Sequence, residues 1–71
     1  MRGDFGEGNA WQFAMGQAVE PVMKAMGVVV LRADSPADVV PTVSAAITMT
    51  FQSGQAVAVL LGQRLIGAKK F

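Results

Sequence analysis

Residues 1–12 contain most of the side chains whose types could do chemistry. Arg2 carries a guanidinium fork that suits carboxylate and phosphonate groups, so it is a candidate for holding an anionic substrate. Asp4 and Glu7 could form a carboxylate pair for acid–base work or a magnesium site. In a loop, residues of these types are usually solvated, so we expect solvated carboxylates and a surface arginine from residue type alone.

The same segment is rich in glycine. Gly3, Gly6 and Gly8 could cradle an anion through their backbone amides. Their spacing matches neither the dinucleotide-binding fingerprint nor the P-loop, and no strand is expected before them. We therefore expect flexible turns.

Other kinds of site are excluded by composition. The chain of 71 residues has no Cys and no His, which rules out disulfides and zinc sites of the usual kinds. Without a histidine, the serines Ser35, Ser44 and Ser53 lack the usual base that activates a nucleophile. The net charge of +1, with no basic run beyond Lys69 and Lys70, gives no reason to expect nucleic acid. We do not expect the isolated chain to be an enzyme.

The elements that must position the opening residues begin with a loop over residues 1–14, with Trp11 and Phe13 as its apolar anchors. A helix is expected from Gly16 to Met26, because apolar residues recur at helical spacing. Pro21 is compatible with that helix near its first turn. Gly27 is a natural residue to end it.

Two buried strands and a second helix are expected next. The first strand covers Val28–Ala33, and its β-branched run indicates burial on both faces, as in a parallel sheet. Ser35 as N-cap, with Pro36 and Asp38 after it, marks a helix start, and Gly54 ends that helix. Pro41 within it predicts a kink or a late start.

The second strand covers Ala56–Leu61 and is expected to be buried on both faces. Residues 15–61 thus form helix, strand, helix and strand, followed by a tail over residues 62–71 in which Lys69 and Lys70 are solvated. A strand, a helix and a second strand predict a parallel crossover and an α/β fold.

The expected fold is only part of a domain. Two strands do not form a stable sheet by themselves. Hydrophobic residues make up 52% of the chain and charged residues 15%, against about 25% charged in ordinary domains. We expect the excess apolar surface to be covered by a partner chain or by further parts of the same domain.

The uncharged stretch from Val39 to Gln63 raises the question of a membrane span. Pro41 and the polar run 52–55 interrupt it, and each half is shorter than the roughly 20 residues that a span requires. No signal peptide is recognisable at the N-terminus. We expect a cytoplasmic protein with no membrane partner.

Several of these residues recur in a known pattern: Arg2-Gly3, Gly6-Glu7, Gln12, Met15-Gly16, Ala25-Met26-Gly27, Asp34 and Val57-Ala58-Val59-Leu60-Leu61. The pattern resembles the pyrimidine-binding domain, or α subunit, of thiamine diphosphate-dependent sulfopyruvate and phosphonopyruvate decarboxylases. The run from Gln63 to Lys70 is similar to the end of that domain in relatives. The resemblance implies the C-terminal half of a flavodoxin-like pyrimidine domain, with its last two strands and the helices before them.

The resemblance also implies a function, the decarboxylation of 2-oxo acids in a site shared between subunits. It makes Arg2, Glu7 and Gln12 substrate-binding residues. It implies no catalytic residue in this chain, because the family's activating glutamate lies upstream and neither Glu7 nor Glu20 is at its position. This loop also lacks the histidine that several relatives have.

Thiamine diphosphate and magnesium are expected in the complete enzyme, and none is expected to be held by this chain alone. The partners implied are an upstream half-domain and a diphosphate-binding domain or β subunit, in an oligomer. The alternative is a non-catalytic structural, assembly or regulatory module.

Overall fold

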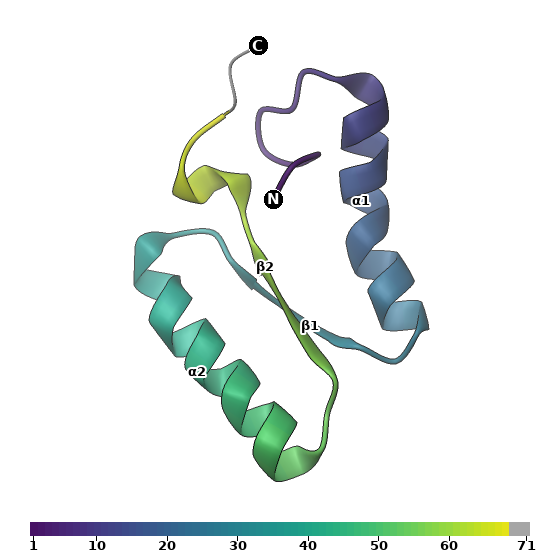
Figure 1. The fold of residues 1–71 in the computed structure, drawn as a ribbon. Coiled ribbons are helices and arrows are strands. Elements are labelled where there is room, and N and C mark those ends of the chain that lie inside the picture. The colour runs from purple at the N-terminus through teal and green to yellow at the C-terminus, as the bar shows by residue number, and fades with distance from the viewer. Residues whose placement is uncertain (69–71) are drawn as a thin grey trace.

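The computed structural model describes residues 1–68 and has the expected order of helices and strands (Figure 1). Helix α1 spans Ala10–Ala25, strand β1 Val29–Ala33, helix α2 Pro36–Ser53 and strand β2 Val57–Leu61, before a short 3-10 helix, η1, at Gln63–Leu65. The solvated tail predicted for Lys69 and Lys70 lies outside the described residues.

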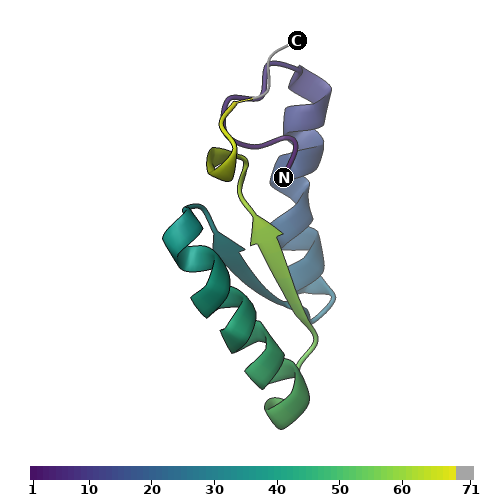
Figure 2. The ribbon, with the colours of Figure 1, turned by 60° about the vertical axis from the view of Figure 1, so that its left-hand side comes forward.

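The two strands pair in parallel, as predicted, with Val29 opposite Val57 and Ala33 opposite Leu61. Helix α1 covers one face of the sheet and α2 covers the other (Figures 1 and 2). The Cα atoms extend over 42 × 28 × 10 Å. Because neighbouring strands lie about 4.8 Å apart, the thin dimension fits a sheet two strands wide. The chain is therefore a thin three-layer α/β unit, with a two-stranded parallel sheet between two helices.

Helix α2 begins and ends where the sequence predicts. Ser35 precedes its first residue, but the Ser35 hydroxyl donates to Asp38 Oδ2 at 2.9 Å rather than accepting from the backbone. Gly54 ends the helix in the left-handed conformation at φ 67°. The late start expected from Pro41 is wrong, because the helix begins at Pro36 and continues through Pro41. Within residues 1–68, neither helix has the length and apolar character needed to cross a membrane.

Helix α1 begins earlier than the sequence suggests. The loop ends at Asn9, not at residue 14, so Trp11 and Phe13 belong to the helix. They are not buried anchors, since Trp11 is 66% exposed and Phe13 is also exposed. Pro21 consequently lies in the helix interior and not in its first turn.

The end of α1 agrees with the expectation. Gly27 has φ 83°, and its N–H donates to the Lys24 carbonyl at 3.0 Å. The N–H of Val28 donates to the Met23 carbonyl, also at 3.0 Å. This pair of bonds is the Schellman arrangement, which satisfies carbonyls that the helix end would leave unpaired. The strand begins at Val29, one residue later than predicted.

The buried core is small. Its buried apolar residues are Ala33, Ala46 and Leu60, and no large side chain among the described residues is fully buried. The predicted burial of both strands on both faces is wrong, because Val29–Leu31 and Val57–Val59 are only partly covered. A helix is about 10 Å across, so its apolar stripe overhangs a sheet only two strands wide.

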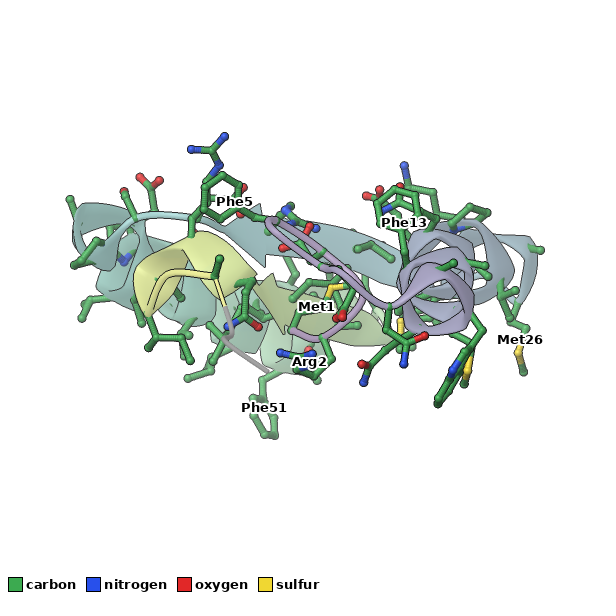
Figure 3. All side chains as sticks on the ribbon, turned by 90° about the horizontal axis from the view of Figure 1, so that it is seen from above. Met1, Arg2, Phe5, Phe13, Met26 and Phe51 are labelled. Carbon is green, nitrogen blue, oxygen red and sulfur yellow. The ribbon has the colours of Figure 1, made fainter. Side chains whose placement is uncertain are left out.

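Large apolar side chains are exposed as a result. Figure 3 shows Met26 and Phe51 projecting from the ribbon, and Phe51 is 83% exposed. Other exposed examples are Met15, Val22, Val40, Ile47 and Ile66.

Candidate functional site

The opening loop, residues 1–9, lies across the carboxyl ends of β1 and β2 (Figure 1). The nitrogen of Met1 donates to the Leu61 carbonyl at the end of β2, at 2.7 Å. The N–H of Gln63 donates to Asp4 Oδ2 at 2.9 Å. In open α/β sheets, ligands bind outside the carboxyl ends of the strands. The loop therefore lies at the end of the sheet where a site is expected.

Glu7 organises this loop from within. Its side chain is only 2% exposed. One oxygen accepts from the N–H of Gly3 at 2.9 Å, and the other accepts from the N–H of Asn9 at 3.2 Å. Arg2 Nη2 lies 3.0 Å from Glu7 Oε1 and completes an ion pair. The buried charge is thus balanced by a cation and two amides, which is the condition for keeping a carboxylate out of water.

Arg2 joins Glu7 to the first turns of α1. Its Nη2 also donates to Gln12 Oε1 at 3.2 Å, so the three residues predicted to bind substrate are brought together. The Arg2 side chain is 32% exposed. It contributes to two shallow hollows, one of about 240 Å³ shared with Trp11 and Gln12, and one of about 390 Å³ shared with Gln63.

The loop can lie this close to α1 because two glycines meet. A Cβ atom added to Gly16 would come within 2.6 Å of Gly3 Cα and would overlap the Gly3 carbonyl. Gly3 itself has φ 69°, which residues with a side chain rarely adopt. Gln17 adds a hydrogen bond from its side chain to the Gly3 carbonyl at 3.3 Å. The glycine inside the helix, which looks like a helix breaker in sequence, is therefore a contact point for the loop.

A second charged cluster holds the loop to the strands. Arg32 Nη2 lies 2.5 Å from Asp4 Oδ2, and Arg32 Nε donates to both oxygens of Asp34 at 3.0 Å. Desolvation acts to raise the pKa of Asp4, but hydrogen bonds from the Gln63 amide and from Arg32 outweigh it and lower that pKa. The hydrogen bonds to Asp34, and then to Asp4, raise the pKa of Arg32 against the opposing effect of burial.

The carboxylates of this loop are not solvated, contrary to the expectation from residue type. The side chains of Asp4 and Glu7 are both mostly buried, and they bind different partners instead of forming an acid–base pair. Arg2 is likewise ion-paired rather than a plain surface residue. Arg32 was not among the site residues predicted from the sequence. The signal was present, because Arg32 is a charge within an otherwise apolar strand, near the end where sites form.

Two further features lie at the same carboxyl end of the sheet. A Cβ atom added to Gly62, which follows β2, would overlap Asp34 Oδ1, so a larger residue there would displace that carboxylate from its place beside Arg32. The Arg64 guanidinium carbon stacks over the Phe5 ring at 4.2 Å from its centre. Cation–π contacts at such distances contribute about 0.5–1 kcal/mol at exposed sites.

Comparison with known proteins adds no assignment: no family model matches the chain, and neither a curated protein nor a solved structure matches it.

The groups present do not by themselves fit a magnesium diphosphate. Among residues 1–68, no three His, Cys, Asp or Glu side chains gather in a way that could hold a metal ion. Arg32 already faces the carboxylates of Asp4 and Asp34, and Arg64 faces an aromatic ring. The chemistry that the cluster of Arg2, Glu7 and Gln12 supports is orientation of a small anionic or carbonyl ligand, with an arginine and an amide as donors.

Proposed function

We propose that this chain is the C-terminal half of the pyrimidine domain of a thiamine diphosphate-dependent 2-oxo acid decarboxylase of the sulfopyruvate or phosphonopyruvate type. It acts only together with an upstream half-domain and a diphosphate-binding partner. The thin α/β slice is the end of a flavodoxin-like sheet. The cofactor supplies the stabilised carbanion when bound, and the protein supplies position and electrostatics.

One observation carries the proposal. The resemblance assigns three residues to the substrate, Arg2, Glu7 and Gln12. Hydrogen bonds from Arg2 to the other two bring them together at the carboxyl end of a parallel sheet. Besides balancing Glu7, the Arg2 guanidinium lies with the Gln12 side chain beside shallow hollows at the carboxyl end of the sheet, where α/β proteins bind ligands. The convergence supports a site whose substrate-facing side this chain provides.

The three residues have different roles in this proposal. Glu7 is a positioning residue, because its buried carboxylate holds Gly3, Asn9 and Arg2. Arg2 pairs with the acidic group of the substrate, since a guanidinium fork suits sulfonates, phosphonates and carboxylates. Gln12 uses its oxygen to accept from Arg2, which orients its amide nitrogen as a donor.

The test reconstitutes the site. The chain is combined with the upstream half-domain and the diphosphate-binding subunit of a decarboxylase of this type, and carbon dioxide release is measured from 2-oxo acids with and without a sulfonate or phosphonate on C3. We expect Arg2→Ala to lower kcat/KM for the doubly anionic substrates by about tenfold to a hundredfold, the loss typical of a charged hydrogen bond. Pyruvate, which lacks the second anion, should be affected much less.

Lys24→Gln is the matched control, because Lys24 is a cation on α1 that pairs with Glu20 away from the loop. It should leave both substrates unaffected. An equal loss for all substrates in Arg2→Ala would assign Arg2 to the structure of the loop alone. Absence of carbon dioxide release from every 2-oxo acid by the assembled complex would overturn the proposal.

The exposed apolar side chains favour one alternative, a non-catalytic assembly or regulatory module. Met26, Phe51 and Ile66 are highly exposed, and exposed apolar side chains that gather into a patch mark protein–protein contact. On this alternative the 71-residue chain forms a symmetric homo-oligomer by itself. Sedimentation equilibrium of the chain alone distinguishes the two: a single stable oligomer of fixed size favours the assembly module, whereas association without a defined size does not. A partner already fully active without this chain would point to regulation instead.

A further inference from the structure

The two edges of β2 are not equivalent. On one edge, the N–H of Val29 donates to the Ala56 carbonyl and the N–H of Gly62 donates to the Ala33 carbonyl, both at 2.8 Å. Backbone groups of successive residues point to opposite sides of a strand. The N–H and C=O groups of Val57, Val59 and Leu61 therefore point away from β1, to the outer edge.

Met1 already lies on that outer edge. Its nitrogen donates to the carbonyl of Leu61, one of the outward-facing groups, at 2.7 Å. The bond is equivalent to the one from Val29 to Ala56, which places Val29 opposite Val57. By the same register, Met1 stands opposite Gly62. Its hydrogen bond is therefore the last of a parallel ladder. The earlier hydrogen bonds of that ladder would lie further back along β2, toward Val57.

The placement of the helices leads to the same edge. Helix α2 connects β1 to β2 across one face of the sheet, and α1 leads into β1 across the other face (Figures 1 and 2). Crossover connections between parallel strands are right-handed in about 98% of cases. Two right-handed crossovers on opposite faces of a sheet lead from the first strand to the second in opposite directions across the sheet. A parallel strand that feeds α1 therefore lies on the β2 side of β1, and, since β2 takes the adjacent place, beyond β2.

The strand sequences agree with this assignment. Strand β2 reads VAVLL and carries no charge, which is typical of an interior strand. Strand β1 carries Arg32, and charged side chains are a common feature of edge strands.

We infer that the outer edge of β2 binds a parallel β-strand formed by polypeptide on the N-terminal side of Met1, and that β1 forms the edge of the sheet. About five residues of that strand would lie opposite Val57–Leu61 and end at Met1. The inference goes beyond the proposed function, because it rests on backbone geometry and would stand if the decarboxylase chemistry failed.

The test uses the absence of cysteine from the chain. A seven-residue extension rich in valine and threonine is joined directly to Met1, with a cysteine as the third residue before Met1. That cysteine would face residue 59, so Val59→Cys should give an intramolecular disulfide on oxidation of a dilute sample. Leu31→Cys is the matched control, because Leu31 pairs with Val59 at the same height of the sheet but on the other strand. Peptide mapping by mass spectrometry identifies the disulfide.

A second measurement uses the same extension without any cysteine, so it does not depend on the folding of a substituted strand. Hydrogen exchange of the Val59 and Leu61 amides should slow about tenfold, as for amides that gain a partner. The outward amides of β1, at Val30 and Arg32, should not change. The same seven residues placed after Phe71 should protect neither pair.

The outcomes separate clearly. A disulfide to residue 59, or selective protection of Val59 and Leu61, supports the inference. A disulfide to residue 31, protection of Val30 and Arg32, or no change at either edge overturns it. Neither readout measures decarboxylation, so a failure here is distinct from a failure of the proposed function.

Discussion

Arg32 at the end of β1 fastens the opening loop through Asp4, a residue 28 positions earlier in the chain. Arg32 Nη2 is 2.5 Å from Asp4 Oδ2, and the same carboxylate oxygen accepts the N–H of Gln63 after β2. One aspartate thus links the loop to both strand ends. The proposed substrate-side residues depend on this link, because Arg2 and Glu7 lie on the loop that it holds.

The link should be sensitive to acid. The pKa of Asp4 is lowered from its ordinary value of 3.8, so its contribution to folding is present above that value and is lost as the pH falls through the lowered pKa. We expect Asp4→Asn to be less stable than the unmodified chain at neutral pH, with the difference shrinking below about pH 4. Denaturant unfolding at several pH values measures it. Glu20→Gln, at an exposed carboxylate on α1, is the control. A difference that stays constant down to pH 2 would contradict the assignment.

Glu7 should matter more for structure than an ordinary surface carboxylate. Glu7→Gln removes the charge that pairs with Arg2 and weakens the acceptors for the Gly3 and Asn9 amides. We expect a loss of about 1–3 kcal/mol in the free energy of unfolding, the usual cost of disturbing a buried hydrogen-bonded group. Faster hydrogen exchange at the Gly3 and Asn9 amides should accompany it. Unchanged exchange at both amides would show that the loop is held by other contacts.

Gly16→Ala tests the contact between loop and helix. In an ordinary helix this change adds about 1 kcal/mol of stability through helix propensity. Here the new methyl group meets the backbone of Gly3, which cannot move aside like a flexible side chain. We therefore expect destabilisation and displaced Gly3 signals in the NMR spectrum. Thr48→Ala on the exposed face of α2 is the control and should be neutral or stabilising. A stabilised Gly16→Ala chain would rule out the close approach.

The exposed apolar surface should drive self-association when no partner covers it. We expect Met26→Gln combined with Phe51→Ser to reduce association in sedimentation experiments while changing stability by only about 0.5 kcal/mol, as for exposed positions. Leu60→Ala provides the contrast, since Leu60 is part of the small core and its truncation should cost about 2–5 kcal/mol. Unchanged association in the double variant would place the contact surface elsewhere.

Local signals were sufficient for the elements. Ser35 and Pro36 start α2, Gly54 ends it, and Gly27 ends α1, because these positions depend on the backbone preferences of single residues. The order of strand, helix and strand predicted a parallel pairing, and the two strands do pair in parallel. The apolar composition also predicted more apolar surface than the chain can bury by itself, and large apolar side chains are indeed exposed. Its predicted cover, a partner chain or further parts of the domain, stays a prediction.

The position of the loop depended on contacts distant in sequence. The start of α1 at Ala10 was missed because the glycine-rich opening favours a loop, and only the structure shows that this loop ends at Asn9 and lies against the helix at Gly16. The burial of Asp4 was missed because its partners are Arg32 and the amide of Gln63, 28 and 59 positions away. The burial of Glu7 was missed although its partners Arg2, Gly3 and Asn9 are close in sequence, because carboxylates in glycine-rich loops are usually solvated.

The sequence by itself determined the order of the helices and strands and the excess of apolar surface, because propensity, capping and composition act within a few residues or over the whole chain. Only the tertiary structure decided which edge of β2 is outward, which carboxylates are buried and where Arg2, Glu7 and Gln12 meet. The edge of β2 and the burial of Asp4 depend on hydrogen bonds between segments far apart in the chain. Arg2, Glu7 and Gln12 meet within residues 2–12, but only because the loop lies back against α1, and no local pattern encodes that placement.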